Sequence, residues 1–376
     1  MIATRRALLG SLAALPFAGG CPALAHTRPA DAAAEAALDA VFAGAAPPAL
    51  AAGIVTREGL SWAGVRGVRR AGTGDAATLD DRWHLGSNTK AMTAAVFARL
   101  VEAGHASWDL TLAGAFPTLT LDPAWRDVPL TRLMTHRSGL VDSEVIGLAW
   151  LTTARSDRRS LPEQRAAIAA AALARPPSGR VGGFAYSNAG YIIVGAAIEA
   201  ISGQAWEAVM GAELFQPLGL TSAGFGAPPD PNAWGHRSVG GKPLPMDPAN
   251  PGADNPLALG PAGTAHMTVA DNGRWVQAMI GGGPEGWLGA DSLSRLTTTT
   301  ETAPAYAPGW ITLPASPFGR LGATIAHEGS NAMWHAIVVA SPERGLGFIA
   351  CSNDSEFGGL ACRALVQRLG DMAPAG

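Results

Sequence analysis

The chain has 376 residues and a net charge of -3, and 48% of its residues are hydrophobic while 15% are charged. This balance is typical of a soluble globular protein with a large core. Because the net charge is small and no long basic or acidic run occurs, the composition argues against nucleic acid or an anionic membrane surface as a partner. A small-molecule or short peptide substrate fits better.

The first 25 residues have the features of an export signal. Arg5 and Arg6 precede an apolar run over residues 7–18, and residues 23–25 offer a small-residue cleavage site. Residues 4–9 also fit a twin-arginine signal, so the general secretory and twin-arginine routes both stay open. Either route predicts a periplasmic or secreted product.

Three further features of the sequence concern membrane attachment, the cysteines and metal binding. No later apolar run is long enough to cross a bilayer. Cys21 is a poor match to a lipoprotein anchor. Cys351 and Cys362 are expected to be two buried thiols, although a disulfide is permitted in an oxidising compartment. The eight histidines and three cysteines show no metal-binding spacing.

The N-terminal third predicts a helix followed by strands. Residues 26–48 have the apolar period of an amphipathic helix. Two apolar runs, 49–55 and 60–68, flank a turn that contains Gly59, which predicts a β-hairpin. Residues 83–85 alternate as a short strand that leads through Gly86 into another helix.

The rest of the chain is helical in the middle and strand-rich at the end. Helices are predicted over residues 128–140, 161–174, 188–201, 269–280 and 360–369. Proline and glycine are dense over residues 217–261, which predicts an irregular loop at a cleft. Strands are predicted over residues 309–313, 321–326, 333–340 and 346–351, the last two as a hairpin.

This order predicts an α/β (α+β) fold. An antiparallel sheet would be built from the N- and C-terminal segments and flanked by helices, with a mostly helical domain inserted between them. The α/β lobe would comprise residues 26–108 and 305–376. Residues 109–304 would form the helical lobe and its cleft-lining loops.

Ser87 and Lys90 stand at the start of the helix expected after Gly86. Lys90 is one of only two lysines in the chain. Free backbone donors and the helix dipole favour a developing oxyanion at this position. The two side chains project from the same helix face, and burial would lower the pKa of the lysine so that it could accept or relay a proton. Taken alone, a capping serine and a surface lysine explain the pattern better.

Tyr186 and Asn188 form a second candidate group. Tyr186 is one of three tyrosines in the chain. A phenol held near a lysine ammonium loses its proton more easily and can act as a general base toward a serine. The amide of Asn188 can hold a substrate carbonyl or orient the lysine. Alone, the pair also fits a core tyrosine and a helix-capping asparagine.

A third group, His327, Glu328, Gly329 and Ser330, follows a predicted strand. Gly329 lets a substrate backbone approach closely, and the Ser330 amide can pair with the Ser87 amide as an oxyanion hole. Considered singly, His327 fits a structural residue at a strand end.

Together the three motifs resemble those of the penicillin-recognising serine hydrolases. The nearest branch contains class C β-lactamases, family VIII carboxylesterases, D-aminopeptidases and related D,D-peptidases. The resemblance runs from about residue 35 to 370 and implies a β-lactamase/transpeptidase-like fold. The flanking segments that resemble family signatures are 133–140, 186–195, 215–220, 261–264 and 342–347.

The resemblance implies a role for each group. Ser87 would be the nucleophile, and Lys90 with Tyr186 would form the proton relay. The backbone amides of Ser87 and Ser330 would stabilise the oxyanion, and Asn188 would contact the substrate amide or ester. An acyl-enzyme would form on Ser87 and be released by water, with no cofactor.

His327 departs from the pattern of the β-lactamases, which usually carry lysine there. An imidazole with a reference pKa near ~6.5 is mostly neutral at pH 7, so an anionic drug would lose a fixed counter-charge. Glu328 would add a negative group if it faced the cleft. Because the esterase and peptidase branches tolerate His-x-Gly, the resemblance implies small esters or D-residue peptides and amides as substrates. A class C-like β-lactamase and a non-catalytic penicillin-binding sensor are the alternatives.

Overall fold

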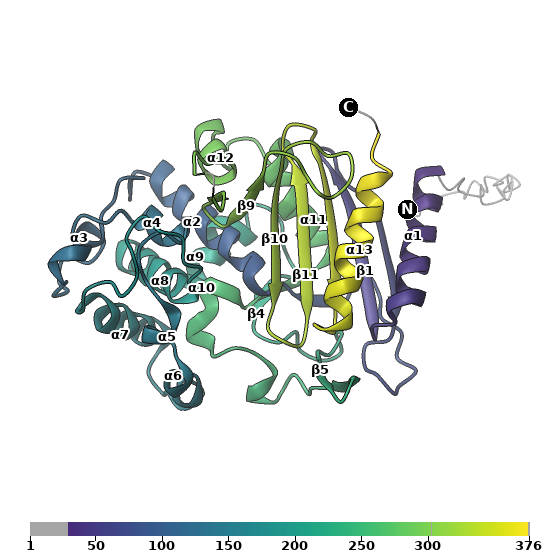
Figure 1. The fold of residues 1–376 in the computed structure, drawn as a ribbon, viewed down its shortest axis with the longest axis horizontal. Helices are drawn as coiled ribbons and strands as arrows, with labels where there is room; N and C mark the ends of the chain where they lie inside the picture. Colours follow the sequence, from purple (N-terminus) through teal and green to yellow (C-terminus); the bar gives the residue numbers. More distant parts are fainter. Residues whose placement is uncertain (1–28, 302, 375–376) are drawn as a thin grey trace, which may run out of the picture.

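A seven-stranded antiparallel sheet dominates the computed structural model, which describes residues 29–301 and 303–374 (Figure 1). The expected export signal, residues 1–25, lies outside the described residues, and so does Cys21. The strand order is β2 (Gly59–Gly67), β1 (Ala49–Thr56), β12 (Leu346–Ser352), β11 (His335–Ser341), β10 (Thr324–Ser330), β9 (Trp310–Leu313) and β8 (Tyr306–Ala307). The expected antiparallel sheet, built from both ends of the chain, is confirmed.

The two faces of this sheet contact different helices. Leu50 and Ile337 belong to a core cluster beneath α1 (Pro29–Ala45) and α13 (Phe357–Asp371). Their neighbours Ala51 and Val338 point the other way, into the main core. This is the two-residue alternation of a strand buried on both faces. α1 and α13 lie at one end of the molecule and helices α3 to α8 at the other (Figure 1).

The helices at the end of the molecule opposite α1 and α13 are organised around α8 (Asn188–Ser202), which is mostly apolar and is buried from Ala189 to Glu199. A helix without a polar face must be surrounded by other elements. The remaining helices are α2 (Thr89–Glu102), α3 (Leu112–Ala115), α4 (Leu130–Met134), α5 (Asp142–Val145), α6 (Leu148–Thr153), α7 (Leu161–Leu173), α9 (Trp206–Met210), α10 (Gly260–Gly263), α11 (Val269–Gln277) and α12 (Ala290–Thr297).

The expected bounds of one helix and one strand were wrong. The helix predicted over residues 128–140 is only α4, because His136 and Gly139 take positive φ angles of 58° and 85° that a helix cannot continue through. β10 continues to Ser330, so His327 lies within a strand.

The segment 217–261 is also not wholly irregular. It contains β4 (Gly224–Phe225) and a hairpin of β5 (His236–Val239) and β6 (Lys242–Pro245). β4 joins β7 (Ala265–Thr268) and β3 (Arg82–His84) in a second sheet of three strands.

Two further expectations concern the thiols and the membrane. Cys351 and Cys362 are buried and free, as expected. Among the residues that the structure describes, no single helix is long and apolar enough to cross a bilayer. One sharply bent pair, α8 with residues 206–215, reaches that length and hydropathy only when its two helices are combined.

Candidate active site

Ser87 sits in a tight turn between β3 and α2. The turn is a short 3-10 helix, Gly86–Asn88, and α2 begins at Thr89. Gly86 has a φ of 51°, and a Cβ atom there would overlap the backbone of Gly329 and Ser330. Only glycine satisfies both conditions, so the turn holds Ser87 directly against β10.

Lys90 is fully buried one turn after Ser87. Its Nζ donates hydrogen bonds to the carbonyl oxygen of Ala262 (2.7 Å) and to Oδ1 of Asn188 (2.8 Å), and lies 3.0 Å from Oγ of Ser87. Burial lowers the pKa of Lys90 to about 7, although the charge of Asp142 opposes this shift. Because the two carbonyl oxygens only accept, a neutral amine places both its protons on them and directs its lone pair at Ser87.

Tyr186, two residues before α8, packs over Ser87 and Lys90. Its ring centroid is 4.9 Å from Nζ of Lys90, and its hydroxyl is hydrogen-bonded to Ser87. Tyr186 is 42% exposed as a residue, yet burial raises its pKa to about 12, and the charge of Asp142 raises it further. The expectation that the phenol loses its proton more easily here is therefore wrong, because burial disfavours the charged form. At neutral pH the hydroxyl keeps its proton.

Asn188 begins α8 and is held by Asp142, a residue that the sequence motifs did not reveal. Asp142 accepts hydrogen bonds from the backbone amides of Asn188 (2.8 Å) and Ala189 (2.9 Å) and from the Ser187 hydroxyl (2.6 Å). It also accepts from Nδ2 of Asn188 (3.1 Å). A carboxylate at a helix N-terminus satisfies free backbone donors and the helix dipole.

Gly329 brings the second candidate oxyanion amide to the first. A Cβ atom on Gly329 would overlap the carbonyl of Leu85 and lie 2.5 Å from the Ser87 nitrogen. The two glycines, Gly86 and Gly329, therefore let β10 and the Ser87 turn meet backbone to backbone. The amides of Ser87 and Ser330 follow these glycines, and Ser330 is exposed at this edge.

His327 is buried and neutral. Its Nδ1 lies 2.7 Å from the carbonyl oxygen of Glu328, which can only accept, so the proton sits on Nδ1. Its Nε2 consequently accepts from the hydroxyl of Tyr306 at 2.9 Å. Burial and the nearby Lys90 lower the pKa of His327 to about 3. The ring thus offers no positive charge at neutral pH.

Glu328 points away from the candidate site. Its carboxylate forms a bidentate pair with Arg363 of α13, with distances of 2.6 to 2.9 Å, and lies 3.3 Å from His335. These partners lower the pKa of Glu328 to about 2. Strand alternation explains the outcome, because the residue after His327 in β10 faces the opposite side of the sheet. Glu328 therefore adds no negative charge beside Ser87.

The three tyrosines of the chain gather around His136. Its ring centroid is 4.3 Å from that of Tyr186, 5.5 Å from Tyr191 and 4.6 Å from Tyr306. The Ser187 amide donates to Nδ1 of His136 (3.1 Å), and burial lowers the pKa of this histidine to about 2. Its nearness to the motif containing Tyr186 comes only from the fold.

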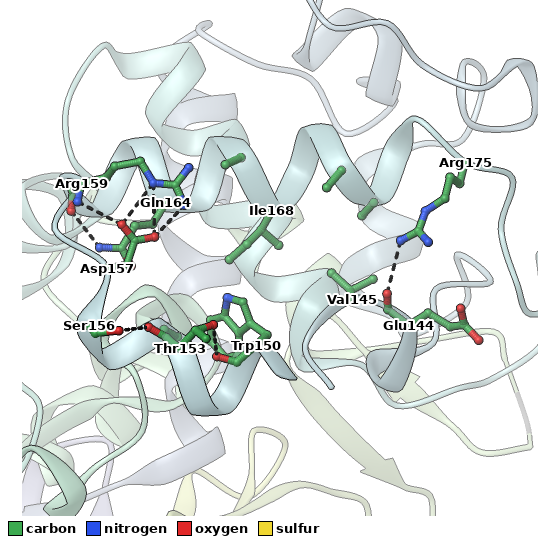
Figure 2. Close-up of a pocket in the computed structure, with 14 residues that line it drawn as sticks. Glu144, Val145, Trp150, Thr153, Ser156, Asp157, Arg159, Gln164, Ile168 and Arg175 are labelled. Carbon is green, nitrogen blue, oxygen red and sulfur yellow. Dashed lines mark hydrogen bonds and ion pairs between the residues drawn. The ribbon is translucent and has the colours of Figure 1, made fainter. Parts of the chain in front are cut away.

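A separate cavity lies beyond α5 (Figure 2). Its volume is about 430 Å³, and Glu144, Val145, Trp150 and Ile168 are among its lining residues, whereas Ser87 is not. It is therefore distinct from the candidate site. Within the part of the chain that the structure describes, no group of three or more His, Cys, Asp or Glu side chains could hold a metal ion.

Several known proteins share this fold. A D-stereospecific amidohydrolase from Streptomyces sp. superposes with a TM-score of 0.70 and 21% identity, over 91% of this chain and 99% of that chain. A β-lactamase/D-alanine carboxypeptidase from Pseudomonas syringae gives 0.71 and 18%, over 92% and 99%. Penicillin-binding protein 4 of Amycolatopsis lactamdurans is 34% identical over 156 residues, which cover 41% of this chain and 39% of that relative.

These similarities define a fold class, that of the β-lactamases and penicillin-binding proteins. Residues 34–369 match the family model described as Beta-lactamase. The match spans most of the chain, and the protein belongs to that family.

Proposed function

We propose that the protein is a periplasmic or secreted serine hydrolase that forms an acyl-enzyme on Ser87 and acts on small esters or on amides and peptides with D-residues. One observation carries the proposal. Lys90 is buried, its pKa is lowered to about 7, and two carbonyl oxygens fix its protons so that the amine faces Oγ of Ser87.

Acylation follows from this geometry. Oγ of Ser87 attacks the substrate carbonyl while its proton passes to Nζ of Lys90. The carbonyl oxygen becomes negative and is held by the amides of Ser87 and Ser330. The Tyr186 hydroxyl, bonded to Ser87, donates its proton to the leaving alcohol or amine and is reprotonated from Lys90. The leaving group departs, and the acyl group remains on Ser87.

Deacylation repeats these steps with water. Water loses a proton to the same relay and attacks the acyl carbonyl, and Ser87 leaves with that proton restored. Asn188 contributes at both stages. Its Oδ1 holds Lys90 and one Nδ2 proton is held by Asp142, so the other Nδ2 proton can bind the substrate carbonyl.

His327 supports esters and amides over β-lactams. Penicillins carry a carboxylate, and a buried neutral imidazole whose Nε2 already accepts from Tyr306 supplies no counter-charge for it. The names of structural relatives, a D-stereospecific amidohydrolase and a D-amino acid amidase, support the D-residue part of the proposal.

A side-by-side substrate panel tests the proposal. Purified mature protein and Ser87→Ala are assayed with short-chain nitrophenyl esters, D-amino acid amides and nitrocefin. We expect hydrolysis of esters or D-amides that the variant abolishes. Equal rates in both proteins would end the proposal. Nitrocefin turnover far above ester turnover would favour a β-lactamase, and a β-lactam adduct that persists for hours in mass spectra would favour a sensor.

The location needs its own experiment. The full-length chain is expressed with its native N-terminus, and the N-terminus of the exported product is sequenced. We expect cleavage after residue 25. Export lost on changing Arg5 and Arg6 to lysine would identify the twin-arginine route, whereas uncleaved protein confined to the cytoplasm would contradict the proposed location.

A further inference from the structure

A buried histidine and aspartate lie behind the Ser87 turn. His84 is fully buried at the end of β3, and its Nε2 lies 3.0 Å from the carboxylate of Asp254, which is 7% exposed. The backbone amide of Gly86 lies 3.1 Å from Nδ1 of His84. An amide only donates, so Nδ1 accepts and the ring proton sits on Nε2, facing Asp254. The imidazole thus links the carboxylate to the residue before Ser87.

The same carboxylate reaches the other side of the oxyanion hole. Oδ1 of Asp254 accepts from Nδ2 of Asn331 at 2.9 Å. The Oδ1 of Asn331 in turn accepts from the amides of Met333 (3.2 Å) and Trp334 (3.1 Å). These bonds close the turn that begins directly after Ser330. The Trp334 ring stacks on His84 with centroids 5.7 Å apart, so the two arms are also in contact.

We propose that Asp254, acting through His84 and Asn331, fixes the separation of the Ser87 and Ser330 amides. This inference rests on the proposed function, because it assigns those amides to the oxyanion hole. His84 sets the amide of Gly86, whose φ of 51° directs the next amide, that of Ser87. Asn331 sets the turn after Ser330. One carboxylate therefore holds both arms, and its hydrogen bonds are strong because the site excludes water.

The role assigned is positioning, since all three side chains are buried and act through the backbone amides that they hold. An oxyanion hole works only when its donors are held where the negative oxygen will form, and a misplacement of about 1 Å costs about a hundredfold in rate. A purely structural polar cluster would instead affect folding alone. The buried pair of Arg165 and Glu199 (2.6 Å) provides that comparison, because it joins α7 to the far end of α8.

Four variants separate the two roles: Asp254→Asn, His84→Asn, His84→Gln and, as the structural control, Glu199→Gln. The asparagine at position 84 keeps an oxygen near the place of Nδ1 and can still accept from Gly86. The glutamine reaches toward Asp254 but leaves Gly86 without an acceptor. Each protein is assayed with a nitrophenyl ester, and the rate is divided by the concentration of active sites found by titration. Each is also tested for binding of phenylboronic acid, whose adduct on Ser87 places an anionic oxygen in the oxyanion hole.

We expect Asp254→Asn and His84→Gln to lower kcat by about tenfold to a hundredfold with little change in KM. Phenylboronic acid should bind more weakly by the same factor. His84→Asn should retain more of its kcat and of its affinity for phenylboronic acid than His84→Gln does. Glu199→Gln should lower the melting temperature and leave kcat and boronate affinity per active site unchanged. If Asp254→Asn does not fold, the two His84 variants decide.

Unchanged kcat and boronate affinity per site in both His84 variants would overturn the inference while leaving the proposed function intact. A wild-type protein without Ser87-dependent hydrolysis would overturn the proposed function as well, so the two failures are distinguishable.

Discussion

Asp142 and Asn188 are joined by two hydrogen bonds, one from the backbone amide (2.8 Å) and one from the side-chain amide (3.1 Å), both to Oδ2. This pairing fixes which end of the Asn188 amide faces Lys90. Its nitrogen must point to the carboxylate, so its oxygen accepts from Nζ of Lys90 at 2.8 Å. Asp142 thereby orients the lysine without touching it and also raises the pKa that burial lowers.

The pH dependence of hydrolysis should report Lys90. The reaction needs the neutral amine, and the pKa of Lys90 is about 7. We therefore expect kcat/KM for an ester to rise about tenfold per pH unit below the pKa and to level off above it. A profile that stays flat across this pKa would contradict the assignment of Lys90 as the base.

Asp142→Asn should shift that profile. The negative charge of Asp142 raises the pKa of Lys90, so its removal should move the acid limb to lower pH. Lost hydrogen bonds at the start of α8 should also cost about 1–3 kcal/mol in the free energy of unfolding. Glu144→Gln, an exposed change on the same helix, is the matched control and should alter neither measurement. A shift of the acid limb to higher pH would contradict the assigned effect of Asp142 on the pKa of Lys90.

Tyr186→Phe should separate relay from packing. It removes the hydroxyl bonded to Ser87 but keeps the ring over Lys90. Loss of a positioned proton donor should lower kcat by about 10²- to 10⁴-fold with stability nearly unchanged. Tyr191→Phe is the control, since its hydroxyl donates to the carbonyl of Met134 at 2.8 Å, and it should retain most activity. Equal activity in the two variants would remove Tyr186 from the relay.

His327→Lys should raise nitrocefin turnover relative to ester turnover, because it supplies the cation that a carboxylate needs. Glu328→Gln changes the net charge by the same amount but on the opposite face of β10, where Glu328 pairs with Arg363. That variant should leave the ratio unchanged. If both variants change the ratio equally, overall charge and not the local cation is responsible.

Gly329→Ala should abolish hydrolysis. A Cβ atom there overlaps the Leu85 carbonyl and would push β10 away from Ser87, separating the oxyanion amides. A loss of at least about 10²-fold in kcat is expected. Gly44→Ala in α1, where a Cβ atom meets nothing within 4 Å, should be fully active. Near-wild-type hydrolysis by Gly329→Ala would show that these amides do not form the hole.

The sequence predicted the elements that carry local periodicity. Apolar runs over residues 49–55 and 346–351 located the strands, and the resemblance of the motifs around Ser87 and Tyr186 to those of a known family indicated the candidate site. Asp142 was missed because a single aspartate carries no local signal in the sequence. Its role appears only when α5 meets the start of α8. Asp254 was missed for the same reason, since its partner His84 is 170 positions away.

The ionisation of Tyr186 was predicted with the wrong sign. A nearby ammonium lowers the pKa of a phenol and burial raises it, and the sequence indicates only the first effect. Burial of Tyr186, which packs against His136, decides the balance even though its hydrogen bond to Ser87 lowers the pKa, and this burial depends on contacts between segments that lie far apart in the chain.

The central place of β12 in the large sheet has a consequence for biosynthesis. β12 lies between β1 and β11, and Leu50 pairs with Ser352, so β1 cannot pair on this side until a strand about 300 residues later has been made. A nascent chain that stops before Leu346 leaves two strand edges open side by side, an arrangement prone to aggregation. Such distant pairing also slows folding. The seven-stranded sheet therefore cannot close until residues 346–352 have been made.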